Sequence, residues 1–147
     1  MSLRMLVGLD DSPRASEVLE TAQNLAKRVG GKLILTRTVG IPHEIPREAY
    51  VLPPDQLSDL LVRESKESLD KLAGTIPADL LEKTRVEIGV PWQIICSVAK
   101  EENVDMVIIG SHGYHGLDRV IGTTAAKVVN HCDRSVLVVR MKNLLSH

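Results

Sequence analysis

Short apolar runs alternate with helix-length amphipathic segments along the whole chain, and this alternation restricts the fold more than any other feature. The sequence predicts strands at Leu3–Leu9, Lys32–Val39, Arg85–Gly89, Met106–Ile109 and Val136–Val139. Between them, apolar residues recur at three- and four-residue steps and predict helices at Ala15–Val29, about Asp55–Ala73, Pro91 to about Asn103, and Thr123–Cys132. A strand and a helix therefore follow one another four times before a fifth strand.

Strict alternation with nearly continuous apolar strands predicts a parallel sheet with helices on both faces, because helical crossovers join parallel neighbours. We expect one α/β domain over residues 1–147, with an open five-stranded sheet in the order 3-2-1-4-5. In such a sheet the chain changes direction between the first and fourth strands, so the loops at Asp10–Ser12 and Gly110–Gly122 should flank a crevice.

Individual residues predict the two ends of the first helix and one long loop. Ser12 is expected to cap the first helix with Pro13 in its first turn, and Gly30 and Gly31 to end it. The segment "GIPHEIPREAYVLPPD" has four prolines and predicts an irregular surface loop that could act as a lid.

Composition excludes several classes of function. The formal net charge is −1 with no basic run, so binding to nucleic acid is disfavoured. No apolar stretch approaches the roughly 20 residues that span a bilayer, and the first residues lack the pattern of a cleavable signal, so a cytoplasmic protein without a membrane partner is expected. Cys96 and Cys132 lack CxxC spacing and are interpreted as small buried hydrophobic residues without chemistry.

The segment "IIGSHGYHGLDRVIGTTAAKVV" carries the strongest functional signal. Glycines 110, 113, 116 and 122 permit positive φ and close approach of a ligand to the backbone, and Thr123 and Thr124 open a helix. A helix N-terminus presents unpaired N–H groups and a partial positive charge, which suits phosphate. The alternative is that the glycines only shape a turn and Thr123 only caps the helix, and spacing alone does not decide between them.

The stretch "GSHGYHGLDRVIGTTAAKVVNH", followed by "SVLVVR", resembles the ATP-binding signature of the universal stress protein family, G-x2-G-x9-G-(S/T). "MLVGLDDS" and "EIGVPWQII…VDMVIIGSHG" are similar to that family too, so the resemblance covers essentially the whole chain. One departure is that eight residues, not nine, separate Gly113 from Gly122. Because the loop glycines and Thr123 are all present, we expect the site to adapt.

The resemblance implies an ATP site. Asp10 would lie near the adenine and ribose, and Thr38 or Val39 would offer backbone groups to adenine. The phosphates would be held by the loop after the fourth strand, through Gly110, His112, Gly113, Gly122, Thr123 and Thr124. Magnesium could accompany the nucleotide, with Asp10 the obvious carboxylate.

Other polar residues of this region have simpler interpretations. His112 and His115 could titrate near neutrality or contact phosphate, but no third ligand stands at metal spacing, so no metal site is predicted. Arg119 could neutralise phosphate charge or be only a solvated loop residue.

The last strand is apolar on both faces and falls at the edge of the predicted sheet, where an open ladder invites association. In the family this strand pairs with its copy across a two-fold axis, so the resemblance implies a homodimer through Val136–Val139.

These features favour a nucleotide-binding stress-response sensor or adaptor with at most slow ATP hydrolysis, because no catalytic base is evident. The alternative is a dimeric interaction module that binds no nucleotide, with the segment from Ile41 to Pro54 and the dimer surface as its functional parts. An adenylating enzyme related to the adenine-nucleotide α-hydrolases is disfavoured, since "GLDDSPRAS" has acids where pyrophosphate needs glycines. A dinucleotide oxidoreductase is also disfavoured, because the G-x-G-x-x-G fingerprint is missing after the first strand.

Overall fold

Five parallel strands form one sheet in the order β3-β2-β1-β4-β5, as predicted. The computed structural model describes residues 2–40, 54–111 and 121–140. The elements are β1 (Arg4–Gly8), α1 (Ala15–Val29), β2 (Lys32–Val39), α2 (Pro54–Ala73), β3 (Leu81–Ile88), α3 (Pro91–Glu101), β4 (Met106–Gly110), α4 (Thr123–His131) and β5 (Ser135–Val139).

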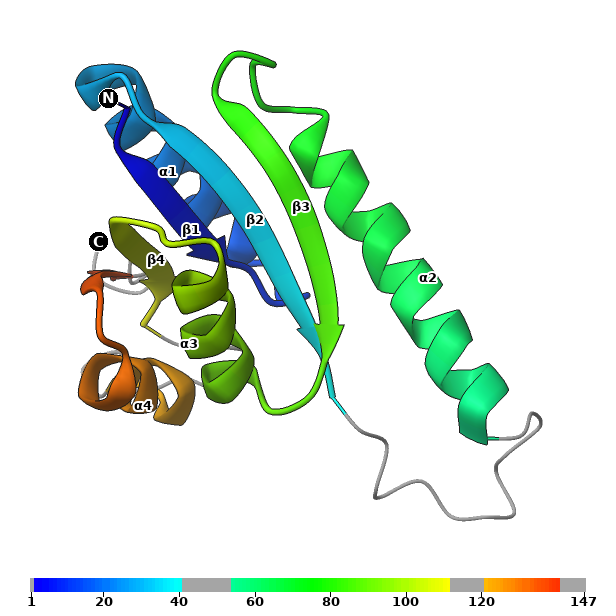
Figure 1. Ribbon diagram of the computed structural model, residues 1–147. Helices are drawn as coiled ribbons and strands as arrows, with labels where there is room; N and C mark the ends of the chain where they lie inside the picture. Colours follow the sequence, from blue (N-terminus) through cyan, green and yellow to red (C-terminus); the bar gives the residue numbers. More distant parts are fainter. Residues whose placement is uncertain (1, 41–53, 112–120, 141–147) are drawn as a thin grey trace, which may run out of the picture.

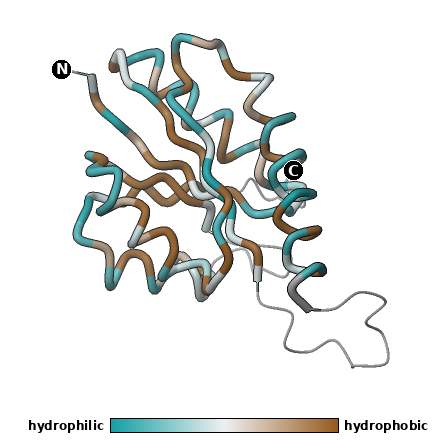
Figure 2. Tube along the Cα trace, turned by 45° about the vertical axis from the view of Figure 1, so that its right-hand side comes forward, coloured by the Kyte–Doolittle hydropathy of each residue, from teal (hydrophilic) through white to brown (hydrophobic). Residues whose placement is uncertain are grey.

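Helices cover both faces of the sheet, again as predicted (Figure 1). Alternate residues of a strand point to opposite faces, so Met5 and Val7 of β1 pack with α1 and α2, whereas Leu6 packs with α3 and α4. The central strands are buried on both faces, and the apolar colouring in Figure 2 follows them through the middle of the molecule. The core is aliphatic because the chain has no phenylalanine.

The predicted start of the third strand was wrong. β3 begins at Leu81 and not at Arg85, because its backbone pairs with β2 from Leu33 to Val39 although its first residues include the charged Glu82 and Lys83. An edge strand needs only backbone hydrogen bonds to be ordered, so its side chains do not have to be apolar.

The capping of α1, but not its start, differs from the prediction. The helix begins at Ala15, its N-cap position is Arg14 without a side-chain cap, and Pro13 lies before the helix. The Ser12 hydroxyl instead accepts a hydrogen bond from the Arg14 N–H at 3.2 Å, inside the turn that precedes the helix. Ser12 therefore stabilises the turn and does not cap α1.

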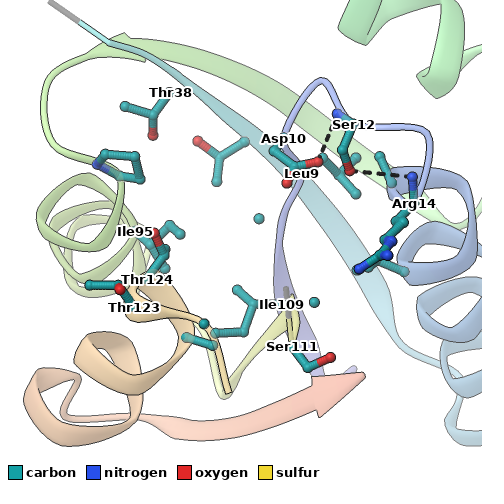
Figure 3. A pocket seen from close by; sticks show the side chains of 18 residues that line it. Leu9, Asp10, Ser12, Arg14, Thr38, Ile95, Ile109, Ser111, Thr123 and Thr124 are labelled. Carbon is teal, nitrogen blue, oxygen red and sulfur yellow. Dashed lines mark hydrogen bonds between the residues drawn. The ribbon is translucent and has the colours of Figure 1, made fainter. Parts of the chain in front are cut away.

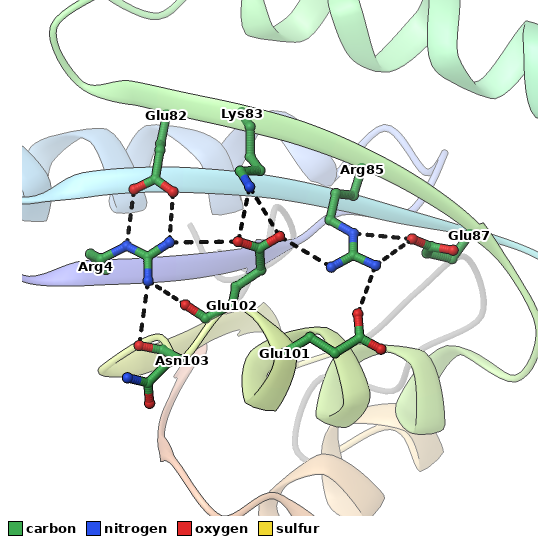
Figure 4. Close-up of polar contacts among 8 residues, drawn as sticks. All are labelled: Arg4, Glu82, Lys83, Arg85, Glu87, Glu101, Glu102 and Asn103. Carbon is green, nitrogen blue, oxygen red and sulfur yellow. Dashed lines mark hydrogen bonds and ion pairs between the residues drawn. The ribbon is translucent and has the colours of Figure 1, made fainter.

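An ionic cluster ties the edge strand β3 to β1 and to the C-terminal end of α3 (Figure 4). Glu102 is its centre, with oxygen–nitrogen distances of 3.0 Å to Lys83 and 3.2 Å to Arg85. Arg4 forms a two-pronged pair with Glu82, 2.6 and 3.0 Å long, and donates to the Glu102 carbonyl. The hydrogen bond from Lys83, followed by the one from Arg85, holds the pKa of Glu102 below its usual value. Arg4 lowers the pKa of Glu82 in the same way.

β5 lies at the edge of the sheet next to β4, which matches the position predicted for it. Val136, Leu137 and Val138 remain half-buried in the single chain. Among the residues that the structure places, no helix has the length and apolarity to cross a membrane.

Candidate functional site

A cavity of about 230 Å³ opens at the carboxyl ends of β1 and β4, where the sheet order changes direction. The β1–α1 turn forms one wall, and the N-terminus of α4 forms the opposite wall (Figure 3). The two loops that the sequence predicted to be neighbours do flank one crevice. Of the predicted binding residues, six line it: Asp10, Thr38, Gly110, Gly122, Thr123 and Thr124.

The β1–α1 turn is held in place by hydrogen bonds to its own backbone. Asp10 Oδ1 accepts from the Ser12 N–H at 2.9 Å, and the Ser12 carbonyl accepts from the Ala15 N–H at 3.2 Å. Arg37 of β2 donates from Nη2 to the Asp10 carbonyl at 2.9 Å. These contacts fix the Asp10 backbone and one carboxylate oxygen while Asp10 remains exposed at the cavity.

The opposite wall ends in backbone N–H groups. The Gly122 N–H donates to the Ser111 carbonyl at 2.7 Å, which joins the two ends of the loop between β4 and α4. The hydrogen bond from Ala126 N–H to the Gly122 carbonyl, 3.0 Å, is the first of α4. The amides of Thr123, Thr124 and Ala125 precede it, and in the described part of the chain none of them has a backbone or side-chain acceptor. All three residues line the cavity, so a helix N-terminus faces it.

This geometry corrects two expectations about the glycines. Gly122 has φ −62° and ψ 162°, and among the described glycines only Gly30 and Gly89 have positive φ, so neither Gly110 nor Gly122 serves a left-handed turn. The N–H of Gly122 is bonded within the chain and is not available to a phosphate. Thr123 does not cap the helix either, because it is the first helical residue and α4 has no side-chain cap.

The floor of the cavity is apolar and tightly packed. Gly8 lies between Ile95 of α3 and Ile109 of β4, and a Cβ atom there would come within 3.1 Å of a carbon atom of each. Glycine therefore lets the floor lie at this depth, and its apolar surface suits an aromatic ring. Gly8 was not among the predicted site residues, although it precedes Leu9 and Asp10 in the strand-one motif.

β2 contributes Thr36 and Thr38 to the lining. Val39 is buried and does not line the cavity, and its carbonyl accepts from the Gly89 N–H at 3.0 Å. Of the two alternatives for a backbone contact at this position, the structure brings only Thr38 to the cavity.

Arg14 and Ser111 also line the cavity and were missed in the sequence. Arg14 supplies a positive charge on the same wall as Asp10, and its position four residues after Asp10 could have signalled it. Ser111 is fully buried and its N–H donates to the Val139 carbonyl at 2.9 Å, a role that depends on the pairing of β4 with β5.

Several predicted residues lie outside the described residues: His112, Gly113, His115, Gly116 and Arg119. Within the ranges that are described, no three His, Cys, Asp or Glu side chains gather as metal ligands. Asp10 is the single carboxylate in the described lining of the cavity. The lining thus combines an apolar floor, a carboxylate, hydroxyl groups, an arginine and free amides, which is suited to a ligand with both a ring and an anionic group.

Cys96 and Cys132 depart from their interpretation as buried hydrophobic residues. Both are half-buried and form no disulfide. The contact between Trp92 of α3 and His131 of α4, 4.8 Å between ring centroids, brings the segments that carry the two thiols together. Burial and the neighbouring Cys132 raise the pKa of Cys96 to about 11.

Comparison with known proteins gives a consistent result. Residues 1–140 match the model of the universal stress protein family. Universal stress protein A homolog 1 of Coxiella burnetii is 26% identical over 139 residues, which cover 94% of this chain and 96% of that protein. Universal stress protein UspA from Lactobacillus plantarum has a TM-score of 0.75 at 26% identity, covering 94% of this chain and 97% of the other. The solved protein MJ0577 has a TM-score of 0.81 at 24% identity, with 97% and 99% coverage.

Proposed function

Since the chain belongs to the universal stress protein family, we propose that its cavity binds an adenine nucleotide, with ATP as the expected ligand. In this proposal the protein is a cytoplasmic stress-response sensor or adaptor whose state depends on the bound nucleotide. Two more distant solved structures support the ligand class. One is a universal stress protein in complex with cAMP, at 20% identity and a TM-score of 0.59. The other is the universal stress protein from Archaeoglobus fulgidus in complex with dAMP, at 15% identity and a TM-score of 0.58.

The observation that carries the proposal is the N-terminus of α4, whose first amides have no acceptor among the described residues and face Asp10 across an apolar floor. Amide donors at a helix N-terminus bind phosphate, and a carboxylate accepts hydrogen bonds from ribose hydroxyls. At about 230 Å³ the cavity is smaller than the roughly 300–1,000 Å³ of pockets for drug-sized ligands. We therefore place the adenosine in the cavity and the phosphates at its mouth, beside Thr123 and Thr124.

Hydrolysis in this site should be slow at most. Phosphoryl transfer needs a group that orients the attacking water and cations that stabilise the developing charge. The described lining offers one carboxylate and Arg14 but no lysine. If magnesium accompanies the nucleotide, Asp10 is the one carboxylate in the described lining that would be available to it.

A thermal shift with ATP and magnesium tests the proposal. At a concentration about 100 times Kd, a ligand that binds only the folded state adds about 2.7 kcal/mol of stability. For 147 residues this corresponds to a rise in Tm of about 9 °C. AMP should give a smaller shift, because it makes fewer phosphate contacts.

Thr123→Pro is the variant that isolates the amide donor. Proline lacks an N–H and is favoured at the first position of a helix, and Gly122 already has the extended conformation that precedes proline. The variant should fold and lose at least about tenfold in ATP affinity. Thr123→Ala keeps the amide and removes only the hydroxyl, so it is the matched control with a smaller loss. Equal affinity of Thr123→Pro and the original protein for ATP would refute the phosphate position.

The edge strand favours a second role that does not exclude the first. Among the described strands, β5 has a neighbour on one side only, β4, and we propose antiparallel pairing of Val136–Val139 between two copies. Sedimentation velocity should then give a dimer. A dimer with no nucleotide-dependent shift would favour the alternative function, an interaction module.

A further inference from the structure

Arg37 of β2 is a buried charge without an ionic partner among the residues that the structure describes. It lies on the face of the sheet covered by α1 and α2, and only 5% of its surface is exposed. The ion pairs found in the described ranges do not include Arg37. Burying an unpaired charge is costly, so a guanidinium in this position is expected to serve a ligand or a structural contact.

The hydrogen bonds of Arg37 leave most of its donor capacity unused. Nη1 donates to the Ser68 hydroxyl at 2.8 Å and Nη2 to the Asp10 carbonyl at 2.9 Å, and both acceptors are uncharged. Nε is buried and has no hydrogen-bond partner among the described residues. A guanidinium has five N–H donors in a planar fork that matches the oxygens of carboxylate and phosphate.

Arg37 lines a second cavity, of about 490 Å³, between the start of α1 and the C-terminal half of α2. Lys71 of α2 also lines it and forms no ion pair with a described residue. Ser68, Thr75 and Ser16 contribute hydroxyl groups to the lining. Asp11 is the one carboxylate present, so the lining residues carry two positive charges and one negative charge.

We propose that this second cavity is a binding site for a phosphate group, either inorganic phosphate or a phosphomonoester. Arg37 and Lys71 provide the charge at two separate points, and the Ser68 hydroxyl, which accepts from Arg37 Nη1, keeps its own O–H as a further donor. The cavity lies on the opposite face of the sheet from α3 and α4, whose residues form the first cavity together with the β1–α1 turn. The proposal does not depend on nucleotide binding in the first cavity.

The two sites share one element, the β1–α1 turn. Arg37 holds the Asp10 carbonyl from one side, while the Asp10 side chain faces the first cavity. A phosphate drawn to the guanidinium therefore binds next to the contact that positions Asp10.

Titration with inorganic phosphate in the absence of nucleotide tests this site. Binding is measured by the shifts of amide NMR signals and by the rise in Tm. Sodium chloride at equal ionic strength is the blank, and glycerol 3-phosphate is the phosphomonoester probe. Saturable shifts at the amides of Ser68 and Lys71 are expected. A response to both probes, or to glycerol 3-phosphate alone, supports the site and identifies the source of the phosphate group.

Lys71→Gln should weaken phosphate binding by about tenfold or more, because one charge-assisted contact is lost. Lys66→Gln is the matched control on the same helix, outside the cavity, and should change affinity less than about twofold. Arg37→Met removes the charge at similar volume, so it should still fold and should lose the response entirely.

Thr123→Pro separates this site from the nucleotide cavity, and it should leave the phosphate response unchanged. A response that Thr123→Pro abolishes and Lys71→Gln preserves would place the phosphate at α4 and overturn the inference. The absence of any saturable response beyond the chloride blank would overturn it as well, without bearing on ATP binding.

Discussion

Replacing Thr36 by valine should stabilise the protein. Thr36 is 1% exposed in the middle of β2, and its Oγ1 is buried without a hydrogen-bond partner among the described residues. A buried polar group without a partner costs about 1–3 kcal/mol, and valine has nearly the same shape with a methyl group in place of the hydroxyl. Both residues are β-branched, so the strand conformation is not disturbed.

The expected gain is about 1–2 kcal/mol in the free energy of unfolding. With an unfolding entropy of about 2.1 cal/mol/K per residue, 1 kcal/mol corresponds to about 3 °C for 147 residues, so Tm should rise by about 3–6 °C. Urea unfolding without nucleotide measures the free energy, and calorimetry measures Tm. Calorimetry is also run without nucleotide, because Thr36 lines the first cavity.

Thr84→Val on β3 is the matched control. Its hydroxyl donates to Asp70 Oδ1 at 3.3 Å, so its loss should bring no gain. If Thr36→Val is less stable than the original protein, the hydroxyl has a partner and the reasoning fails. An equal gain in both variants would attribute the effect to strand propensity and not to the unpaired oxygen.

Three further predictions follow from the packing and the ionic cluster. Glu102 has a lowered pKa in the folded state, so its contribution to stability is present at neutral pH and is lost as the pH falls below about 4.5. Between about pH 6 and pH 4, the free energy of unfolding measured in urea should therefore fall less for Glu102→Gln than for the original protein. Gly31→Ala should destabilise the folded protein by about 1–3 kcal/mol in the same assay. The added Cβ would lie 2.6 Å from the Met5 Cε and 2.8 Å from the Leu3 carbonyl oxygen. An unchanged midpoint of urea unfolding would contradict this packing. Cys96, with a pKa raised to about 11, should react with iodoacetamide at pH 8 about a hundredfold more slowly than an ordinary thiol. Rapid labelling detected by mass spectrometry would contradict the raised pKa.

The boundaries that the sequence predicted well are those with a local physical cause. α1 from Ala15 to Val29 and β2 from Lys32 to Val39 were predicted correctly, because the periodicity of apolar residues and the end of the helix at Gly30 depend only on residues close in sequence. The start of β3 and the role of Ser12 were not predicted correctly. The first residues of β3 are ordered by pairing with β2, and Ser12 forms a turn with Asp10, so both depend on contacts that the local sequence pattern does not show.

The candidate site divides in the same way. The polar residues after β1 and β4 could be predicted, because parallel strands present their carboxyl ends at one edge of the sheet. The floor at Gly8 and the inaccessible amide of Gly122 could not, since each depends on a partner far away in the chain or across a loop.

By itself, the order of apolar and amphipathic segments determined a parallel sheet with helices on both faces, because helical crossovers join parallel neighbours. Only the tertiary structure decided which donors remain free and which charges remain unpaired. Within the described residues, it showed amides without acceptors at Thr123 and Thr124, and an Arg37 that holds the Asp10 carbonyl and has no ionic partner. Whether a polar group is satisfied depends on every atom around it, and those atoms come from segments that the sequence keeps apart.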